Sequence, residues 1–446
     1  MLTRRRFLGA TLATATLAPL ATLLGRPAWA HAYGPLVPDP EGILDLPEGF
    51  SYRVVQRLGD RMTDGHVVPG EPDGMWCFTG PDGRWVLMRN HEVDRPVHHS
   101  AYPADQTPGE AYAQGRYGGV TRVVIDPQTG DVVSSNLVLA GTCRNCAGGP
   151  SPWGWISCEE SIEPGHGYAF LCPIDATSVQ APIRIPGYGR FHHEAAAIDP
   201  DTAIAWLTED RVQGAFYRFV PHDPAVPFVG RLQALRAVDT VGFDTATEMS
   251  PGDRIACAWV DLTDPEPPED NPGTRHEAFE LGALRIKRGE GITLSDGIVW
   301  ICSTTGGPVE GGQIFRLFDG TTDTPTLELV AQSTSLDRLD MPDNVVMAPW
   351  GQLFMCEDGR GGNGLRGLTA DGEVFDFAVN RLSGSELAGA CFSPDGRAMF
   401  VNVQHNHLTL MIEGPFPDVS PASTWTATAC PSLEGTSDAR LVLDEE

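Results

Sequence analysis

Short apolar runs recur along the chain, each preceded by a turn and followed by a polar or acidic tip. Six copies of this pattern occupy residues 82–92, 153–160, 203–210, 297–304, 351–358 and 397–405. Most copies are followed by a second apolar run, and no long helical periodicity interrupts them. Repeated antiparallel units of this size are typical of a β-propeller. We therefore predict an all-β fold, a single propeller of about six blades.

The spacing of the copies is uneven, and the interval 220–289 departs most from the pattern. We expect inserted loops or a small extra element there, so that the predicted propeller carries inserted loops and short helices. The 50 glycines and 37 prolines among 446 residues fit a fold with many turns.

Residues 1–30 have the pattern of a secretory signal. The motif Arg4-Arg5-Arg6 precedes a weakly apolar stretch over residues 7–24, and Ala28-Trp29-Ala30 has the form of a cleavage site. Paired arginines followed by Phe-Leu are typical of the twin-arginine subtype, which is recognised by an export receptor. The alternative is an uncleaved anchor helix. We predict a signal peptide over 1–30, a single propeller domain over 31–446, and a periplasmic or secreted protein.

The composition restricts the partners of the exported chain. Asp and Glu number 59 against 31 Lys and Arg, which gives a formal net charge of -28. Such a surface repels phosphate backbones and anionic lipids. We therefore expect no nucleic acid as a specific partner, and no membrane association after cleavage.

The predicted architecture has a chemical consequence for the acidic tips. Because propeller blades converge on a central channel, tips from different blades can surround one point. Acidic tips on several blades would form a ring of carboxylates, whose mutual repulsion requires cations. The pattern therefore predicts a site for several cations.

Cys143 and Cys146 have C-x-x-C spacing, which leaves several interpretations open. They could form a redox pair, half of a zinc site or a local disulfide, but no second C-x-x-C or matching histidine pair completes a zinc site. A single thiolate at Cys146, beside the turn Ala147-Gly148-Gly149, could instead bind a transition metal. Cysteines such as Cys302 and Cys356 lie in apolar runs and are expected to be buried thiols.

Three glutamates stand just before apolar runs, at places that we interpret as equivalent: Glu194, Glu290 and Glu386. Glu194 follows His192-His193, whose side chains alternate sides in a strand. We therefore take Glu194 as the metal ligand and a histidine as a supporting or substrate contact. Arg288 stands two residues before Glu290 and could hold a phosphate by forked hydrogen bonds, whereas a surface salt bridge is the alternative.

Oxygen ligands flank the fifth copy of the pattern. Asp343 and Asn344 precede its apolar run, and Asp358 follows it. Carboxylate and amide oxygens suit calcium, whereas an Asx-turn is the structural alternative. No Gly-x-Ser-x-Gly or P-loop motif is present, which argues against a serine hydrolase or a nucleotide-binding protein.

Taken together, these segments resemble the PhoX family of bacterial alkaline phosphatases. The resemblance rests on the twin-arginine start and, in order along nearly the whole chain, on residues 90–92, 145–149, 158–160, 190–194, 288–291, 342–344, 386 and 392–396. It implies a β-propeller that hydrolyses phosphate monoesters at an iron–calcium cluster in its central funnel, with a metal-bound oxygen as nucleophile. The implied cofactors are two Fe3+ ions and two or three Ca2+ ions around a bridging oxo group.

The resemblance also implies roles for individual residues. Cys146 resembles the thiolate ligand of the iron pair, and Glu194, Glu290 and Glu386 resemble its carboxylate ligands. The calcium-side candidates are Glu160, Asp343 and Asp358. Arg288 resembles a contact to the substrate phosphate. His192 is the second candidate catalytic residue, standing where the resemblance leads us to expect a basic side chain.

We therefore predict an exported, monomeric phosphatase acting on small phosphorylated substrates, with the twin-arginine machinery as its export partner. Two alternatives remain open from the sequence. One is a calcium-dependent propeller hydrolase of the lactonase or phosphotriesterase type, which would have no use for Cys146. The other is a non-catalytic binding propeller whose ions are structural.

Overall fold

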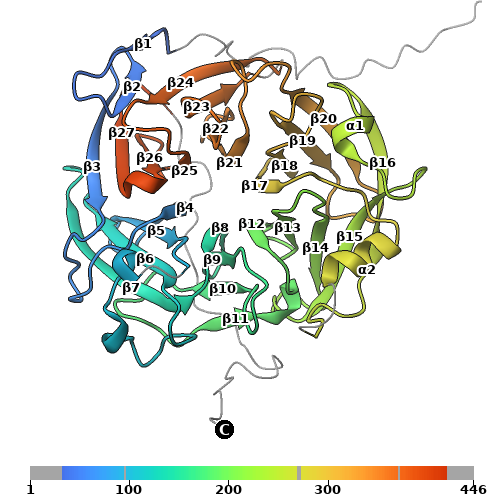
Figure 1. Cartoon of the computed structure of the whole chain (residues 1–446), viewed down its shortest axis with the longest axis horizontal. Helices are drawn as coiled ribbons and strands as arrows, with labels where there is room; N and C mark the ends of the chain where they lie inside the picture. The colour runs from blue at the N-terminus through green and yellow to red at the C-terminus, as the bar shows by residue number, and fades with distance from the viewer. Residues whose placement is uncertain (1–32, 95–96, 269–272, 370–371, 419–446) are drawn as a thin grey trace, which may run out of the picture.

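The computed structural model describes residues 33–94, 97–268, 273–369 and 372–418. Their strands form six antiparallel units around a central axis, in the manner of propeller blades (Figure 1). The prediction of an all-β propeller of about six blades is thus confirmed. The signal peptide predicted over residues 1–30 lies outside the described residues.

The first three blades follow one another in chain order. Blade 1 consists of β4 (Pro72–Thr79), β5 (Trp85–His91), β6 (Gly118–Ile125) and β7 (Val132–Thr142). Blade 2 consists of β8 (Asn145–Ser151), β9 (Gly154–Glu159), β10 (Ala169–Cys172) and β11 (Ile183–Ile185). Blade 3 consists of β12 (His193–Ile198), β13 (Ala205–Glu209), β14 (Phe216–Pro221) and β15 (Gly230–Ala237).

The last three blades complete the ring. Blade 4 consists of β17 (Gly289–Ser295), β18 (Ile298–Ser303), β19 (Gln313–Phe318) and β20 (Thr326–Gln332). Blade 5 consists of β21 (Pro342–Met347), β22 (Leu353–Glu357), β23 (Gly364–Leu368) and β24 (Val374–Asn380). Blade 6 consists of β25 (Leu387–Phe392), β26 (Ala398–Val403), β27 (Leu408–Glu413) and, from the other end of the chain, β3 (Ser51–Arg57).

Blade 6 closes the propeller by combining the two ends of the described chain. β3 pairs antiparallel with β27, from Leu408 opposite Arg57 to Glu413 opposite Ser51. Closure of this kind protects what would otherwise be exposed sheet edges. The short strands β1 (Leu36–Val37) and β2 (Leu44–Pro47) extend blade 5 through β24.

The interval 220–289 contains the extra elements that its irregular pattern predicts. β16 (Arg254–Asp261) pairs with both β15 and β20 and so joins blades 3 and 4 into one sheet. The helices α1 (Thr245–Glu248) and α2 (Thr274–Glu280) flank it (Figure 1). Short 3-10 helices occur in other connections, namely η2 (Val97–His99), η3 (Ala104–Gln106), η4 (Pro186–Tyr188) and η5 (Gln404–Asn406). None of the helices in the described part of the chain has the length and apolarity needed to cross a bilayer.

The hydrophobic core lies between neighbouring blades. Between blades 6 and 1, for example, Phe400 and Met411 pack with Leu87 and Met75, all of them buried. Similar clusters fill the other blade interfaces. Because apolar side chains occupy these interfaces, each blade is fixed relative to the next, and the inner strands are held in a ring.

The six repeated runs of the sequence are the second strands of the blades. The innermost strands surround the central axis in Figure 1, and each contacts the inner strands of both neighbouring blades. These strands are β4, β8, β12, β17, β21 and β25. The glutamates predicted to precede apolar runs are therefore at the beginnings of inner strands. Glu194 lies in β12 and Glu290 in β17.

Candidate metal centre

Every inner strand begins with the same irregularity, a one-residue β-bulge. In β12, His193 pairs with Glu209, but the next pair is Ala196 with Leu207. A bulge bends the strand and redirects the side chains beside it. In each blade we call the residue directly after the last regular pair before the bulge the bulge position. From blade 1 to blade 6 the bulge positions are Asp73, Cys146, Glu194, Glu290, Asp343 and Gly389.

Five of these six positions carry a carboxylate or a thiol, and the side chains gather in two groups. Glu194, Glu290 and Asp343 form the first, which we call the carboxylate triad, with ligand atoms within 4.8 Å of one another. Asp73 and Cys146 form the second with Glu92, which follows β5. Its ligand atoms also lie within 4.8 Å of one another, and we call it the thiol triad.

Small residues allow the inner strands to approach closely enough to bring the side chains of the two triads together. The residues that follow the six bulge positions, mostly Gly or Ala, line a cavity on the axis: Gly74, Ala147, Ala195, Gly291, Asn344 and Ala390. A Cβ added to Gly74 would lie 2.6 Å from Ala147 Cα, and one added to Gly291 would lie 2.5 Å from Val345 N. A side chain at either glycine would therefore push neighbouring inner strands apart.

The main chain beside Cys146 is fixed by Asn90. Its Nδ2 donates to Cys146 O at 3.1 Å and to Ala147 O at 2.6 Å, and its Oδ1 accepts from Trp155 Nε1 at 2.7 Å. Cys143 and Cys146 are not joined, and all nine cysteines of the described residues are free and buried. Among the open interpretations of the C-x-x-C motif, this geometry favours a single thiol that faces the axis.

The two triads repel one another electrostatically. Burial raises the pKa of Glu194 well above its usual range, and the charges of Asp343 and Asp73 raise it further. Burial, then Asp358, raises the pKa of Asp343 to about 7. Burial, then Asp73, raises the pKa of the Cys146 thiol. Without a counter-charge, these groups would have to be protonated or leave the axis.

The chemistry of the two triads fits cations. Both carboxylate oxygens of Glu194 and one of Asp73 are buried without a hydrogen-bond partner. Buried polar atoms are nearly always paired, so these oxygens lack something that a bound ion would supply. A thiol beside carboxylates suits a transition metal, and the all-carboxylate group suits calcium.

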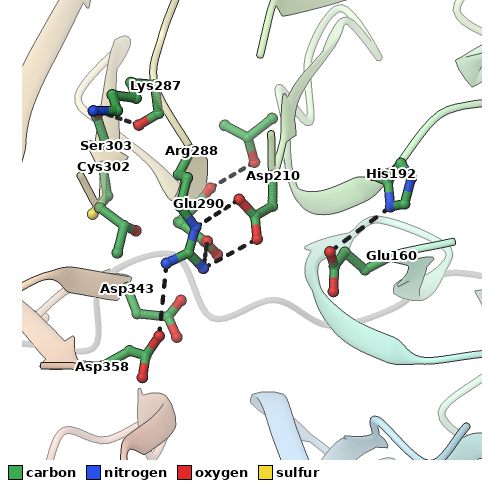
Figure 2. A network of polar contacts seen from close by, with 12 residues as sticks. Glu160, His192, Asp210, Lys287, Arg288, Glu290, Cys302, Ser303, Asp343 and Asp358 are labelled. Atoms are coloured by element: carbon green, nitrogen blue, oxygen red, sulfur yellow. Dashed lines mark hydrogen bonds and ion pairs between the residues drawn. The ribbon is translucent and has the colours of Figure 1, made fainter. Parts of the chain in front are cut away.

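Arg288 lies beside the carboxylate triad (Figure 2). Its guanidinium donates from Nε and Nη2 to the two oxygens of Asp210 at 2.9 and 3.1 Å, and also from Nη2 to Glu290 Oε1 at 2.9 Å. Nη1 lies 3.8 Å from Asp358 Oδ2. Arg288 is therefore held in place by the acids around it, as a fixed positive charge beside the predicted metal ligands.

Glu160 and His192 face one another on the side of blades 2 and 3 (Figure 2). His192 Nδ1 lies 3.8 Å from Glu160 Oε1, and Arg144 bonds both Glu160 and Glu92. His193 points elsewhere, as the alternation of a strand requires. Its Nε2 donates to Gly189 O at 2.9 Å and its ring stacks on Phe191.

Comparison with known proteins gives the family. The sequence model of the family described as alkaline phosphatase PhoX matches residues 31–138 and 129–407, which together make up most of the chain. The chain belongs to the PhoX family. It is therefore a phosphoric ester hydrolase of the PhoX type.

Solved structures with a similar fold were also found. PhoX of Pseudomonas fluorescens, in complex with vanadate as a transition state analogue, aligns with a TM-score of 0.66 at 19% identity, covering 84% of this chain and 96% of that one. A gluconolactonase of Xanthomonas campestris aligns with a TM-score of 0.45 at 13% identity, covering 87% of this chain and 99% of that one. A comparison with curated protein sequences found no match.

In this PhoX chain, most of the predicted site residues lie in or around the two triads. Cys146, Glu194, Glu290 and Asp343 belong to the triads themselves. Surrounding them are Asp358, Glu160, Arg288 and His192. The roles assigned to these residues stay predictions.

The interpretation of Glu386 as the blade 6 equivalent of Glu194 and Glu290 is wrong. In β25 the regular pairing ends at Ala388, so the equivalent position is Gly389. A Cβ there would lie 2.1 Å from Asp73 O, which excludes a side chain. Glu386 lies before β25 and is still close to the site, because burial, then Asp343 and Asp358, raises its pKa.

Sequence reasoning did not assign Asp73, Glu92 or Asp210 to the site. A signal for Asp73 was available, since Pro72-Asp73-Gly74 matches Pro342-Asp343-Asn344 at the head of an inner strand. Glu92 was named only as the tip of the first repeat and within residues 90–92 of the family resemblance, without a role as a ligand. Asp210 likewise ends a repeat, and only the three-dimensional structure shows that it pairs with Arg288.

The raised pKa of Asp343 predicts how the metal-free PhoX protein responds to pH. The folded state keeps a proton that the unfolded state loses near pH 4, so stability is lost as pH rises from about 4 through about 7. Asp343→Asn removes this loss. In urea unfolding after chelation, we expect the free energy of unfolding of the variant, relative to that of wild type, to increase by up to about 4 kcal/mol between pH 4 and pH 8. The control Asp337→Asn, on an exposed turn, should follow wild type. Parallel curves for Asp343→Asn and wild type would contradict the prediction.

Proposed function

We propose that this PhoX protein is an exported phosphomonoesterase that works with an iron–calcium cluster at the propeller axis. The observation that carries the proposal is the meeting of two triads, buried except for the half-buried Glu92 and drawn from five inner strands and one strand tip. The unpartnered oxygens of Glu194 support the presence of cations there. The twin-arginine pattern of residues 1–30 supports export to the periplasm or beyond.

We assign the ions by the chemistry of the donors. Cys146, with Asp73 and Glu92, offers thiolate and carboxylate ligands, which suit ferric iron. Asp343, Asp358 and Glu160 offer oxygen ligands, which suit calcium. Glu194 and Glu290 share the carboxylate triad with Asp343, and we assign them as ligands that both kinds of ion would share. Burial raises the pKa of Glu386, and Asp343 and Asp358 are close enough for their charges to raise it further. Two Fe3+ and two or three Ca2+ ions with a bridging oxo group would, when bound, act as Lewis acids toward a phosphate ester.

The protein's own side chains would orient the substrate. Arg288 is a planar donor pre-positioned by Asp210, so little side-chain entropy is lost when it binds the phosphate. Its charge would stabilise the equatorial oxygens during phosphoryl transfer. We assign His192 a contact to the leaving group or to a bound water, because it faces Glu160 and its ring nitrogens have no hydrogen-bond partner. Small phosphate monoesters are the substrate class that such a clamp recognises.

The position of Cys146 favours this proposal over a single-calcium hydrolase. Calcium takes oxygen ligands, and a calcium-only site would have no use for a buried thiol within 4.8 Å of two carboxylates. A non-catalytic propeller with structural ions would likewise have no use for an arginine held beside the ions.

Hydrolysis of p-nitrophenyl phosphate tests the function directly. We expect activity in the purified protein, its loss when a calcium chelator is added, and its recovery with excess CaCl2. The oxygen-rich side of the site would release calcium readily, since calcium ligands are flexible and exchange. Activity that persists after complete removal of calcium would contradict the proposal.

Cys146→Ala tests the iron assignment. We expect loss of iron and at least a hundredfold loss of activity, because the thiol triad keeps only two of its three ligand side chains. The matched control is Cys172→Ala, another buried cysteine, which lies in the apolar cluster between blades 1 and 2. Iron is measured by elemental analysis of both variants. A Cys146→Ala protein with full iron and activity would refute the assignment.

Arg288→Ala tests the phosphate clamp. We expect inhibition by inorganic phosphate to weaken by about tenfold or more, with the metal content retained, since a forked charged contact is lost. Arg288→Lys should restore the positive charge but not the paired hydrogen bonds that a guanidinium donates to phosphate. Arg254→Ala, which removes an exposed partner of Glu328, is the control. Unchanged phosphate inhibition in Arg288→Ala would exclude the role.

A further inference from the structure

A third group of side chains with ligand atoms close together lies outside the two triads. Glu71, His99 and His407 place one ligand atom each within 4.8 Å of one another. They come from three segments: Glu71 precedes β4, His99 ends η2 in the connection between β5 and β6, and His407 lies between η5 and β27. All three are partly buried.

The distances within this group are those of ligands around a common ion. His99 Nδ1 lies 3.0 Å from Glu71 Oε1, yet it is buried and makes no hydrogen bond, so the two atoms do not point at one another. Neighbouring ligands of a tetrahedral zinc ion are separated by about 3–3.5 Å, and their lone pairs point at the ion. His407 Nδ1 lies 4.0 Å from the same oxygen.

The tautomer of His407 suits a metal ligand. The backbone N–H of Glu71 donates to His407 Nδ1 at 3.2 Å, so this nitrogen carries its lone pair on the side of Glu71. A metal ligand must be the unprotonated nitrogen of a neutral imidazole. Because Nδ1 has a single lone pair, a metal ion bound there would replace this hydrogen bond, which at 3.2 Å is at the long end of the usual range.

A third histidine, His405, contacts the Glu71 carboxylate without belonging to the group. His405 Nδ1 lies 3.0 Å from Glu71 Oε2, the oxygen that does not face His99. Metal-bound carboxylates are commonly held by such an outer hydrogen bond, which fixes their orientation.

We propose that Glu71, His99 and His407 bind a divalent transition-metal ion of the zinc class, separate from the cluster at the axis. Imidazole nitrogens with one carboxylate suit zinc and not calcium, which takes oxygen ligands. The ion ties the connection between β5 and β6 to the turn between β26 and β27. It thus pins blade 1 to blade 6, where the propeller is closed. The proposal does not depend on the reaction at the axis.

Zinc EXAFS on the purified chain, first loaded with calcium and iron and then given one equivalent of ZnCl2, tests the proposal. We expect nitrogen and oxygen in the first shell, with outer-shell scattering from two imidazole rings. The triads cannot produce this signal, because neither contains a histidine. Sulfur in the first shell, or no imidazole scattering, would overturn the proposal, and this measurement needs no variant.

Variants then identify the ligands. His99→Gln with His407→Gln should lose one zinc ion per chain in equilibrium dialysis and lose the imidazole signal. His405→Gln should keep the ion with affinity lowered by about tenfold or more, as expected for an outer-shell partner. The control is His276→Gln, which removes the histidine of an exposed His–Glu pair on α2. Retention of imidazole-bound zinc by the double variant would overturn the assignment.

Discussion

The main constraint on the structure of this PhoX protein is the repulsion between carboxylates that the fold buries together at its axis. Glu194, Glu290, Asp343 and Asp73 lie at the beginnings of four inner strands and face one axis. In the low dielectric of a protein interior, such charges are tolerated only with cations or protons between them. Arg288 and Arg144 neutralise part of this charge at Glu290 and Glu92. Both oxygens of Glu194 stay buried without a hydrogen-bond partner within the described residues, so the repulsion at Glu194 is not relieved by the chain itself.

Two repeated features of the backbone produce the convergence. A one-residue bulge at the start of each inner strand redirects the side chain that follows it. A small residue comes next in most blades, and at Gly74 and Gly291 the neighbouring backbone leaves no room for a Cβ. The hydrophobic clusters between blades then hold the six strands in position, so the packing energy of the propeller opposes the repulsion at its axis.

The repeat in the sequence was enough to predict the blades, because alternating apolar runs and turns are local properties of the chain. Cys146, Glu194, Glu290 and Asp343 could be chosen because each has a recognisable motif and a place in that repeat. Glu386 shows the limit of this reasoning. The true equivalent, Gly389, is three positions further along the chain, and only the strand register shows where the bulge falls. The pairing of Arg288 with Asp210 could not be predicted either, since these residues belong to different blades and meet only when the propeller closes.

Anomalous diffraction at the iron edge, from crystals of the protein purified after export by its own signal, tests the central claim most directly. We predict iron within bonding distance of the Cys146 sulfur and of triad carboxylates, with calcium filling the remaining oxygen-lined positions. An active enzyme whose two triads hold no metal ions, with protons or water between the acids instead, would contradict it.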